Sequence, residues 1–332
     1  MAEAPVAVLG AGSWGTALAI ELGRHQPVLL WSHSAQEVAA LARDRENRHY
    51  LPGVPFPESL QMEADLGAAL AAAAEVLVVV PSHAFAGLLA RIAELAPELP
   101  ALCWATKGFD PESGGLLSEV AAHYLPHAGR AVLSGPTFAA EVARGLPTAI
   151  TVAADDPALA ERLARRLRSD HFRPYTATDL VGVQVGGAAK NVMAIAAGIS
   201  DGLGFGANAR AALITRGLSE ITRLGLALGG EKETFMGLAG LGDLVLTCTD
   251  DQSRNRRLGL ALAAGQDVAE ARAAIGQEVE GINTAREVWH KARELGIEMP
   301  ITEQTYRVLY EGLDPRRAVH NLLARQMRAE GL

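Results

Sequence analysis

Residues 5–22 read PVAVLGAGSWGTALAIEL, and this stretch decides the expected fold. Residues 5–9 form a short apolar run with the β-branched composition of a strand. The glycine loop GAGSWG (residues 10–15) follows at once, and residues 16–22 have the composition of a helix. The stretch therefore predicts a buried strand that turns sharply into a helix.

The three glycines of this loop have different expected roles. Gly10 permits the tight turn, Gly12 lets the backbone approach a pyrophosphate, and Gly15 lets the helix pack close to the strand. The free N–H groups and the positive dipole end of the helix N-terminus favour a phosphate there. A glycine-rich turn with no chemical role is the alternative, but a GxGxxG pattern between a strand and a helix favours a dinucleotide site.

The composition is that of a soluble globular protein long enough for two domains. Of the 332 residues, 49% are hydrophobic and 20% are charged, which is ordinary for this class. A formal net charge of −8 argues against nucleic acid as a partner, because nucleic-acid binding needs a basic surface. Cys103 and Cys248 are the only cysteines, so no disulfide framework is expected and a reducing compartment is indicated.

No targeting or membrane segment is expected. The N-terminus reaches the first strand within a few residues, without a basic, apolar and cleavable signal. The apolar stretch 76–90 is interrupted by Pro81 and His83 and is too short to span a bilayer. We therefore expect a cytoplasmic protein with no membrane insertion.

The first half of the chain alternates strand and helix signals. Ser34 is a candidate helix N-cap, with Glu37 as its capping-box partner. Residues 76–80 (VLVVV) are a continuous apolar run typical of a buried parallel strand. Repeated βα units of this kind predict an open, doubly wound sheet. The other elements expected here are strands at 27–31, 101–106, 131–134 and 148–153 and an arginine-rich helix at 156–169.

The pattern changes near residues 175–179, and only helices are expected beyond that point. The segments with helical apolar spacing or composition are 181–199, 208–228, 270–295 and 302–310. We therefore expect two domains: residues 1–178 as an α/β domain with a Rossmann-type, doubly wound sheet, and residues 179–332 as an all-α substrate and catalytic domain.

The end of the second expected strand bears on the choice of cofactor. Nicotinamide-binding sheets often place there an acidic residue that holds the ribose 2′-OH. This chain has Ser32, His33 and Ser34 instead, with no acid before Glu37. Small polar groups and a histidine accept a 2′-phosphate that an aspartate would repel, so NADPH is favoured and NADH is tolerated. The alternative for His33 is a surface histidine at a strand end.

Lysine is rare in this chain, because the basic residues are almost all arginine. Only Lys107, Lys190, Lys232 and Lys291 occur. A buried lysine can lose its proton near neutral pH and an arginine cannot, so a retained lysine favours a role that needs this chemistry. Codon bias that left four lysines by chance is the alternative.

Lys190 lies in the segment GGAAKN, which is expected to be helical. Its neighbours three and four positions away are Gly186, Gly187, Met193 and Ala194, and none of them is charged. The small residues leave room for a ligand against the helix, and a lysine there is partly desolvated, which lowers its pKa. Such a group can give a proton to a ketone and take one from an alcohol. The alternative is a snorkelling lysine over a tight helix contact.

Three further segments carry candidate functional groups. Lys107 follows an expected strand, and ligands bind at the carboxyl ends of strands in doubly wound sheets. Asp243 lies in an expected flexible loop, GLGD, where it could orient a lysine ammonium or serve as a turn or cap residue. In the run SRNRR, Arg254 can bind a phosphate bidentately, with Ser253 and Asn255 adding hydrogen bonds. A solvated basic face is the alternative for this run. The sequence shows no metal-ligand cluster, no serine–histidine triad and no carboxylate pair.

With these residues in view, the chain resembles the bacterial NAD(P)-dependent sn-glycerol-3-phosphate dehydrogenases along essentially its full length. The segments that carry the resemblance are GAGSWGTALA from Gly10, VVVPSH from Val78, WATKG from Trp104, SGPTFA from Ser134, GGAAKNV from Gly186, DGLGFGANARAALITRG from Asp201, MGLAGLGDLVLTC from Met236, QSRNRR from Gln252 and MPITE from Met299. Together these segments are far more specific than any one motif.

The resemblance implies an activity and a set of site residues. The activity is hydride transfer that interconverts sn-glycerol 3-phosphate and glycerone phosphate with NADP or NAD, supplying glycerol 3-phosphate for phospholipid synthesis. Lys190 is the implied acid/base, and Lys107 and Asp243 assist it. The residues implied around the substrate are Lys107, Gly135, Thr137, Lys190, Asp243, Thr247, Ser253, Arg254 and Asn255. Those expected around the cofactor are Gly10, Gly12, Ser13, Trp14, Gly15, His33, Lys107, Ala139, Arg254, Glu278 and Glu280.

One residue departs from the family pattern, since Glu278 stands where the resemblance leads us to expect a small apolar residue. Analogy with the family also implies a homodimer through the helical domain. Two other functions are weighed against the leading one. A dehydrogenase of another phosphorylated or carboxylated β-hydroxy substrate fits the same plan, although the SRNRR run favours a phosphate. A nucleotide-sensing protein without catalysis is the other, and it would have no need of Lys190.

Overall fold

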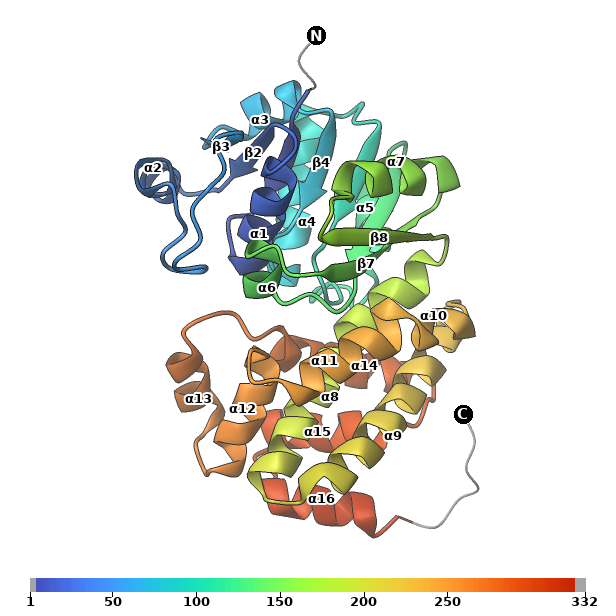
Figure 1. The fold of residues 1–332 in the computed structure, drawn as a ribbon. Coiled ribbons are helices and arrows are strands. Elements are labelled where there is room, and N and C mark those ends of the chain that lie inside the picture. Colours follow the sequence, from blue (N-terminus) through green and yellow to red (C-terminus); the bar gives the residue numbers. More distant parts are fainter. Residues whose placement is uncertain (1–3, 326–332) are drawn as a thin grey trace. The chain divides into compact units, whose positions relative to one another are not determined.

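Eight strands form one sheet in the first part of the chain, and the computed structural model describes residues 4–325 (Figure 1). The strand order is β3-β2-β1-β4-β5-β6-β7-β8. In chain order the strands are β1 (Val6–Leu9), β2 (Val28–Trp31), β3 (Leu60–Glu63), β4 (Glu75–Val78), β5 (Ala101–Trp104), β6 (Gly129–Ser134), β7 (Thr148–Ala154) and β8 (Phe172–Ala177).

The sheet is parallel from β3 through β6, and its last two strands run the other way. β7 pairs antiparallel with β6, and β8 then pairs parallel with β7. The predicted α/β fold with a doubly wound sheet is confirmed by this arrangement and by the helical part that follows it.

Two strands were not predicted from the sequence, and both lie at the edges of the sheet. In β3 only Leu60 is fully buried, and in β8 only Phe172 is. An edge strand with one buried side chain has little of the apolar pattern that marks a strand. Pro174 is tolerated in β8 because an edge strand leaves some N–H groups without a sheet partner.

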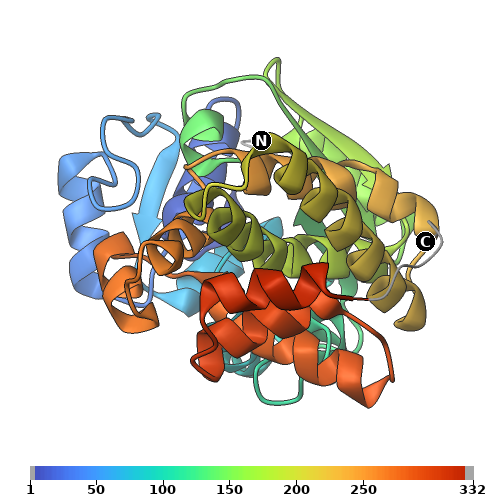
Figure 2. The ribbon, with the colours of Figure 1, turned by 90° about the horizontal axis from the view of Figure 1, so that it is seen from below.

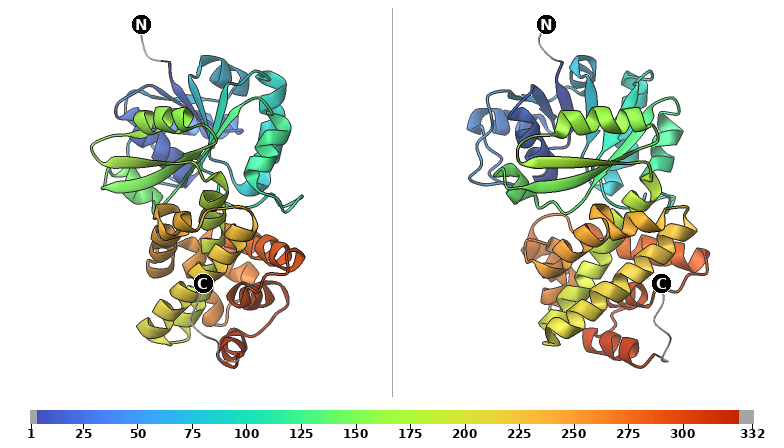
Figure 3. Two further views of the ribbon diagram at one scale, coloured as in Figure 1. Left: turned by 90° about the vertical axis from the view of Figure 1, so that its right-hand side faces the viewer. Right: turned by 45° about the vertical axis from the view of Figure 1, so that its right-hand side comes forward.

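Helices cover both faces of the sheet (Figure 3). Their bounds are α1 (Ser13–Gly23), α2 (Ala35–Asp44), α3 (Leu66–Ala72), α4 (Ser82–Leu95), α5 (Leu117–Tyr124), α6 (Ala139–Ala143) and α7 (Pro157–Leu167). The apolar residues of α1, α6 and α7 join one buried cluster with the strands, whereas α4 packs with α3 and α5.

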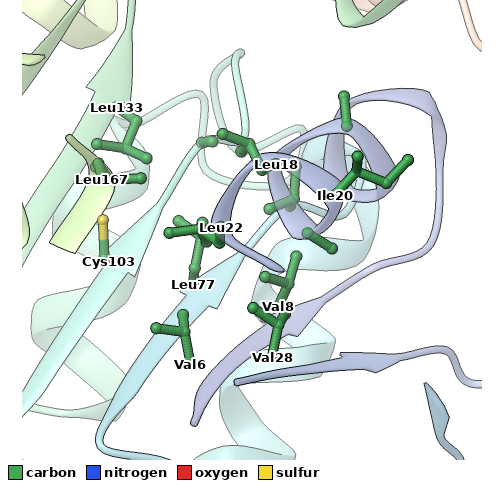
Figure 4. Close-up of a cluster of buried hydrophobic side chains, with 14 of the residues drawn as sticks. Val6, Val8, Leu18, Ile20, Leu22, Val28, Leu77, Cys103, Leu133 and Leu167 are labelled. Atoms are coloured by element: carbon green, nitrogen blue, oxygen red, sulfur yellow. The ribbon is translucent and has the colours of Figure 1, made fainter. Parts of the chain in front are cut away.

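The core of this sheet follows the two-residue period of its strands. Figure 4 shows Leu18 from α1 and Leu167 from α7 packed over strand side chains that include Cys103. The next residue of β5, Trp104, has the opposite orientation, and its ring meets Phe85 of α4 edge-on at 5.9 Å between centroids. Burial of each such side chain contributes about 1.5–3 kcal/mol.

The second part of the chain is helical, and its helices can be followed in Figure 2. They are α8 (Leu180–Gly202), α9 (Gly206–Ala227), α10 (Lys232–Met236), the π-helical turn η1 (Leu238–Gly242), α11 (Asp243–Thr249), α12 (Arg254–Ala263), α13 (Val268–Ile275), α14 (Glu280–Glu294), α15 (Pro300–Tyr310) and α16 (Pro315–Leu323). The single helix predicted at 270–295 is wrong: Gly276, at φ 66°, ends α13, and α14 starts afresh.

The chain divides into two compact units, and one short segment crosses the division. The first unit comprises the chain up to Thr106 together with Leu117–Leu180, and the second comprises Lys107–Leu116 together with the chain from Val181 onward. Residues 107–116 leave the end of β5, are closed by an antiparallel bridge between Phe109 and Leu116, and belong to the second unit. Lys107 therefore lies in the helical unit, although the sequence places it after a strand of the sheet.

The longest apolar helix is α8, whereas from the sequence only residues 76–90 were considered as a possible membrane span. By length and composition α8 could cross a membrane, but 83% of its most apolar window is buried inside the protein. Residues 182–200 are all buried among other helices of the second unit. This burial is what a core helix of a helical domain shows.

Candidate functional site

The glycine loop after β1 is shaped by close backbone contacts. Gly10 has φ 123°, and a Cβ placed on it would lie 2.8 Å from the carbonyl oxygen of Val79. A Cβ on Gly15 would lie 1.9 Å from the carbonyl oxygen of Gly10, whereas a Cβ on Gly12 would meet nothing within 4 Å. Gly10 and Gly15 are therefore required by packing, while Gly12 leaves open space beside the backbone.

The same loop fits the pyrophosphate of a dinucleotide. Gly12 is the N-cap of α1 and offers no side-chain oxygen to the first N–H groups, and the first turn of α1 contains no acidic residue. An anion is therefore favoured at this helix N-terminus by both the N–H groups and the dipole. Trp14 adds an indole N–H that is buried with no hydrogen-bond partner among residues 4–325.

The loop after β2 brings an acidic group closer than the sequence suggests. His33 is exposed just beyond the end of β2. Ser34 caps α2 by accepting from the N–H of Glu37 at 3.2 Å, but the carboxylate of Glu37 accepts a hydrogen bond from the Ser32 hydroxyl instead of completing a capping box. A carboxylate therefore stands beside the end of β2, where the sequence alone placed only neutral polar groups and a histidine.

The loop after β6 carries three of the predicted residues. Gly135, with φ 159°, follows the strand, Thr137 donates a hydrogen bond to the Gly135 carbonyl at 3.2 Å, and Ala139 begins α6. Because β1, β2 and β6 run parallel, this loop lies at the same carboxyl edge of the sheet as Gly10 and His33. The hydroxyl of Ser134, which the sequence did not single out, is buried there without a partner among the described residues.

Lys190 lies in the middle of α8, and a turn of backbone fills the space beside it. A Cβ on Gly186 would lie 2.6 Å from the carbonyl oxygen of Ala239, so η1 packs directly against α8. The prediction that Gly186 leaves room for a ligand is therefore wrong, because it leaves room for this turn. Asp243 follows η1 directly and is thereby brought to Lys190.

Two lysines share one buried carboxylate. The Lys107 Nζ donates to Asp243 Oδ2 at 2.6 Å, and the Lys190 Nζ donates to the other oxygen, Oδ1. The Lys190 Nζ also donates to the Thr247 hydroxyl at 2.9 Å, and that hydroxyl donates to the Asp243 carbonyl at 2.6 Å. Asp243 is 1% exposed and Lys190 is 7% exposed, so water screens these charges little.

Burial, more than the neighbouring charges, favours a neutral Lys190. Two ammonium groups against one carboxylate leave one uncompensated positive charge in a buried site. Burial lowers the pKa of Lys190 to about 7, helped by the charge of Lys107 and opposed by the attraction of Asp243. A lysine that titrates near neutral pH can both donate and accept a proton under physiological conditions.

Asp243 is not in a flexible loop, so that prediction is wrong. It is the first residue of α11, its side chain is buried, and the preceding Gly240 is so enclosed that a Cβ there would lie 2.2 Å from the Phe235 carbonyl oxygen. A π-helical turn often marks a functional site, because it places a side chain where a regular helix would not. The sequence signal, three glycines in six residues, is common to loops and to this turn.

The predicted phosphate-binding run begins α12. Ser253 is the N-cap and its hydroxyl accepts from the N–H of Arg256 at 3.2 Å. The Asn255 amide donates to Asn191 Oδ1 at 3.0 Å and accepts from the Gly281 N–H at 2.9 Å. Ser253 therefore caps α12 itself, the side chain of Asn255 links α12 to α8 and α14, and Arg254 lies between them as the first residue of α12.

The predicted cofactor segment near residue 280 begins α14. Glu280 is the first residue of that helix, and Glu278 pairs with Arg272 at 3.3 Å. The carboxylate of Glu278 thus has a local partner. Within residues 4–325 no group of three or more histidine, cysteine, aspartate or glutamate side chains is placed to hold a metal ion.

Asn191 is a site residue that sequence reasoning missed. It follows Lys190 in α8, is 6% exposed, and links α8 to Asn255. The signal for it was present, because two adjacent polar residues, Lys190 and Asn191, interrupt the apolar middle of α8. The rarity of lysine in this chain pointed to Lys190, and asparagine has no such rarity.

Comparisons with known proteins agree along both units. The family model described as the N-terminus of NAD-dependent glycerol-3-phosphate dehydrogenase matches residues 5–160, and its C-terminal counterpart matches residues 179–320. The proteins named glycerol-3-phosphate dehydrogenase (NAD(P)+) from Photobacterium profundum and Nitrosococcus oceani are 56% and 58% identical over 326 residues. These alignments cover 97% of this chain and 96% and 94% of those proteins.

A solved structure matches at the level of the whole fold. The crystal structure of glycerol-3-phosphate dehydrogenase from Coxiella burnetii superposes with a TM-score of 0.95 at 49% sequence identity. The match covers 97% of this chain and 99% of that one.

Proposed function

We propose, from the premise that this chain belongs to the family of NAD-dependent glycerol-3-phosphate dehydrogenases, that Lys190 is the proton donor and acceptor of its reaction. The reaction is the interconversion of sn-glycerol 3-phosphate and glycerone phosphate with NAD or NADP. The observation that supports the role of Lys190 is the buried cluster of two lysines on one carboxylate.

The chemistry assigned to the second unit is proton transfer at the substrate C2 oxygen. The bound nicotinamide supplies or removes the hydride at C2. In the oxidation, neutral Lys190 takes the hydroxyl proton, and in the reduction its ammonium gives a proton to the carbonyl oxygen. Asp243 holds Lys190 in place and, with Lys107, keeps its pKa near the working pH.

The substrate phosphate is assigned to the start of α12. Arg254 offers a guanidinium whose planar fork matches a phosphate, and the N-terminus of a ten-residue helix adds its dipole. We assign Ser253 and Asn255 to the substrate beside Arg254, and Thr247 to the substrate beside Lys190. The remaining proposed substrate residues are Gly135 and Thr137 from the first unit.

The cofactor is assigned to the carboxyl edge of the sheet. Gly10, Gly12, Ser13, Trp14 and Gly15 form the pyrophosphate loop, and His33 faces the adenosine ribose. Ala139, Lys107, Arg254, Glu278 and Glu280 are the remaining proposed contacts. With His33 exposed and Glu37 beside Ser32, we expect both NADPH and NADH to be used, with NADPH preferred.

Three properties of the protein in the cell are part of the proposal. The two cysteines are free and buried, which suits a reducing compartment such as the cytoplasm. The product sn-glycerol 3-phosphate suits a role in glycerophospholipid synthesis. By analogy with the family, we propose a homodimer that forms through the helical unit. Sedimentation equilibrium tests the dimer by measuring the molar mass in solution.

The test is turnover of the purified protein as a function of pH. Consumption of NADPH with glycerone phosphate should depend on protonated Lys190, so kcat/KM for the reduction should fall as pH rises through about 7. Oxidation of sn-glycerol 3-phosphate needs neutral Lys190, so its kcat/KM should rise through the same pH range. Absence of turnover in both directions refutes the function, and parallel pH profiles refute the role of Lys190.

A further inference from the structure

The guanidinium of Arg256 is bound on several sides by groups of the protein. Its Nη1 donates to Asp201 Oδ2 at 2.5 Å and to the Cys248 carbonyl at 3.4 Å, and its Nε donates to Asp251 Oδ1 at 2.8 Å. The side chain is only 10% exposed. Burial opposes its charge, but the two aspartates raise the pKa of Arg256 above its usual value. This arginine is therefore not part of a solvated basic face, which was one alternative for the SRNRR run.

Two partners of Arg256 belong to helices that carry the proposed site, and the third, Asp251, lies between α11 and α12. Asp201 lies near the end of α8, whose middle holds Lys190. Cys248 lies near the end of α11, whose first residue is Asp243. Arg256 itself lies in the first turns of α12, two residues after Arg254, so one guanidinium joins the ends of α8 and α11 to the start of α12.

The backbones of α8 and α12 also touch where Arg256 lies. A Cβ on Gly198 would lie 2.1 Å from the carbonyl oxygen of Arg256, and a Cβ on Gly259 would lie 2.1 Å from the carbonyl oxygen of Ile195. This contact brings the two helix backbones as close as glycine allows. The hydrogen bond from Arg256 to Asp201 adds a side-chain link between the same two helices.

The ion pair of Arg256 and Asp201 belongs to a larger group of paired charges. Asp201 Oδ2 also accepts from Arg210 of α9 at 2.7 Å, and its Oδ1 is buried with no partner among the described residues. Removal of either charge breaks this buried ion pair and leaves the remaining member with one charged partner, Arg210 for Asp201 or Asp251 for Arg256. A shorter cation at position 256 cannot reach Asp201, Asp251 and the Cys248 carbonyl together, because lysine lacks the planar fork of arginine.

We propose that Arg256 is a positioning residue, which holds the first turn of α12, and with it Arg254, in register with the helices that carry Lys190 and Asp243. Its Nη1 and Nε donors are directed to Asp201, Cys248 and Asp251, so we assign the substrate phosphate to Arg254 and not to Arg256. This proposal rests on the proposed function, since it concerns the placement of the phosphate-binding arginine relative to the proton donor.

The test compares Arg256→Lys, Asp201→Asn and the matched control Arg257→Lys, which changes the next residue, an exposed one. We expect Arg256→Lys to lower kcat/KM for glycerone phosphate by up to about 10²-fold, the cost of roughly 1 Å of misplacement. For glycerone phosphate the loss should appear mainly as a higher KM. For unphosphorylated dihydroxyacetone, kcat/KM should fall less than it does for glycerone phosphate. The Kd for NADPH, from quenching of tryptophan fluorescence, should change less than twofold, and Arg257→Lys should match the wild type.

Asp201→Asn separates positioning from direct contact with the phosphate. If Arg256 positions Arg254, loss of the Asp201 charge raises KM for glycerone phosphate as Arg256→Lys does, and the double variant resembles the worse single variant. If Arg256 bound the phosphate itself, Asp201→Asn would release the guanidinium and leave KM unchanged or lower it. That outcome, or a folded Arg256→Lys with wild-type KM, overturns the proposal.

Two measurements keep the outcome decisive. Thermal unfolding reports whether each variant folds, and if Arg256→Lys does not, Asp201→Asn decides. Calorimetry of sn-glycerol 3-phosphate binding is run beside the kinetics. If the wild type binds this ligand without turnover, the proposed function is refuted but the positioning role of Arg256 is still tested. The Kd values of the same three variants for sn-glycerol 3-phosphate then replace their KM values.

Discussion

The glycine loop of the first unit and the lysine cluster of the second are built in opposite ways. The loop (residues 10–15) consists of six consecutive residues whose backbone shape is the functional feature. The cluster consists of side chains from three separate segments, namely the segment after β5, α8 and α11, and Lys107 and Asp243 are 136 residues apart in the chain. An added side-chain atom is expected to damage the loop, and the loss of a functional group is expected to damage the cluster. Four sets of substitutions, in these two regions and in the neighbouring binding segments, test this contrast.

The largest effect is expected in the cluster, from Lys190→Met. Methionine keeps an apolar stem of similar size and removes the proton donor, so the variant should fold and bind NADPH. Loss of a general acid/base costs about 10²–10⁴-fold in kcat. The control is Lys232→Met, which changes an exposed lysine of α10 and should keep wild-type kcat. More than about a tenth of wild-type kcat in Lys190→Met would rule out the assigned role.

A smaller effect is expected from Arg254→Ala, at the start of α12. A hydrogen bond to a charged group contributes about 1.5–3 kcal/mol, so kcat/KM for glycerone phosphate should fall roughly 10- to 100-fold. Unphosphorylated dihydroxyacetone should lose much less, because it has no phosphate for Arg254 to bind. Equal losses for the two substrates would show that Arg254 does not recognise the phosphate.

In the glycine loop, Gly15→Ala and Gly12→Ala should separate packing from ligand binding. The Cβ at residue 15 would lie 1.9 Å from the Gly10 oxygen, so we expect the free energy of unfolding to fall by about 1–3 kcal/mol. The Cβ at residue 12 meets nothing, and its φ of −71° suits alanine, so stability should change by less than about 0.5 kcal/mol. Only NADPH affinity should suffer there. Chemical denaturation and fluorescence titration measure the two quantities, and a stable Gly15→Ala would contradict the packing account.

The smallest effect is expected at the end of β2, from the pair His33→Asp and Glu37→Gln. An aspartate at position 33 can accept from a ribose 2′-OH and repels a 2′-phosphate, so the ratio of kcat/KM for NADPH to that for NADH should fall. Removal of the Glu37 charge beside Ser32 should raise the same ratio. Solvent screens both effects, and each should remain within about tenfold at fixed salt. Unchanged ratios in both variants would mean that this loop does not face the adenosine ribose.

The elements that the sequence predicts well are those with a local cause. The strand, loop and helix at residues 5–22 were found because apolar runs and glycines act over a few residues. The two strands that were missed, β3 and β8, bury one full residue each and show no strong pattern. The break between α13 and α14 depends on Gly276, one glycine in a segment that otherwise has helical composition.

The candidate site shows the same division. Lys190 stood out because it is a rare lysine in an apolar helix, and the structure shows it buried beside Asp243 and Thr247. The packing role of Gly186 could not be predicted from the sequence, because the turn that packs against it lies 53 residues further along the chain. The acidic group at the end of β2 was also misjudged, since Glu37 is brought to Ser32 by the first turn of a helix.

By itself, the sequence determined the fold class, the family, the pyrophosphate loop and the rare lysines, because these depend on short patterns and on residue chemistry. Only the tertiary structure decided that Lys107 belongs with the helical unit, that Asp243 is shared by two lysines, and that Arg256 is bound by two aspartates. The physical reason is that burial and charge pairing depend on residues far apart in the chain. The pKa of Lys190 falls to about 7 because packing removes water and brings the charge of Lys107 close, against the attraction of Asp243.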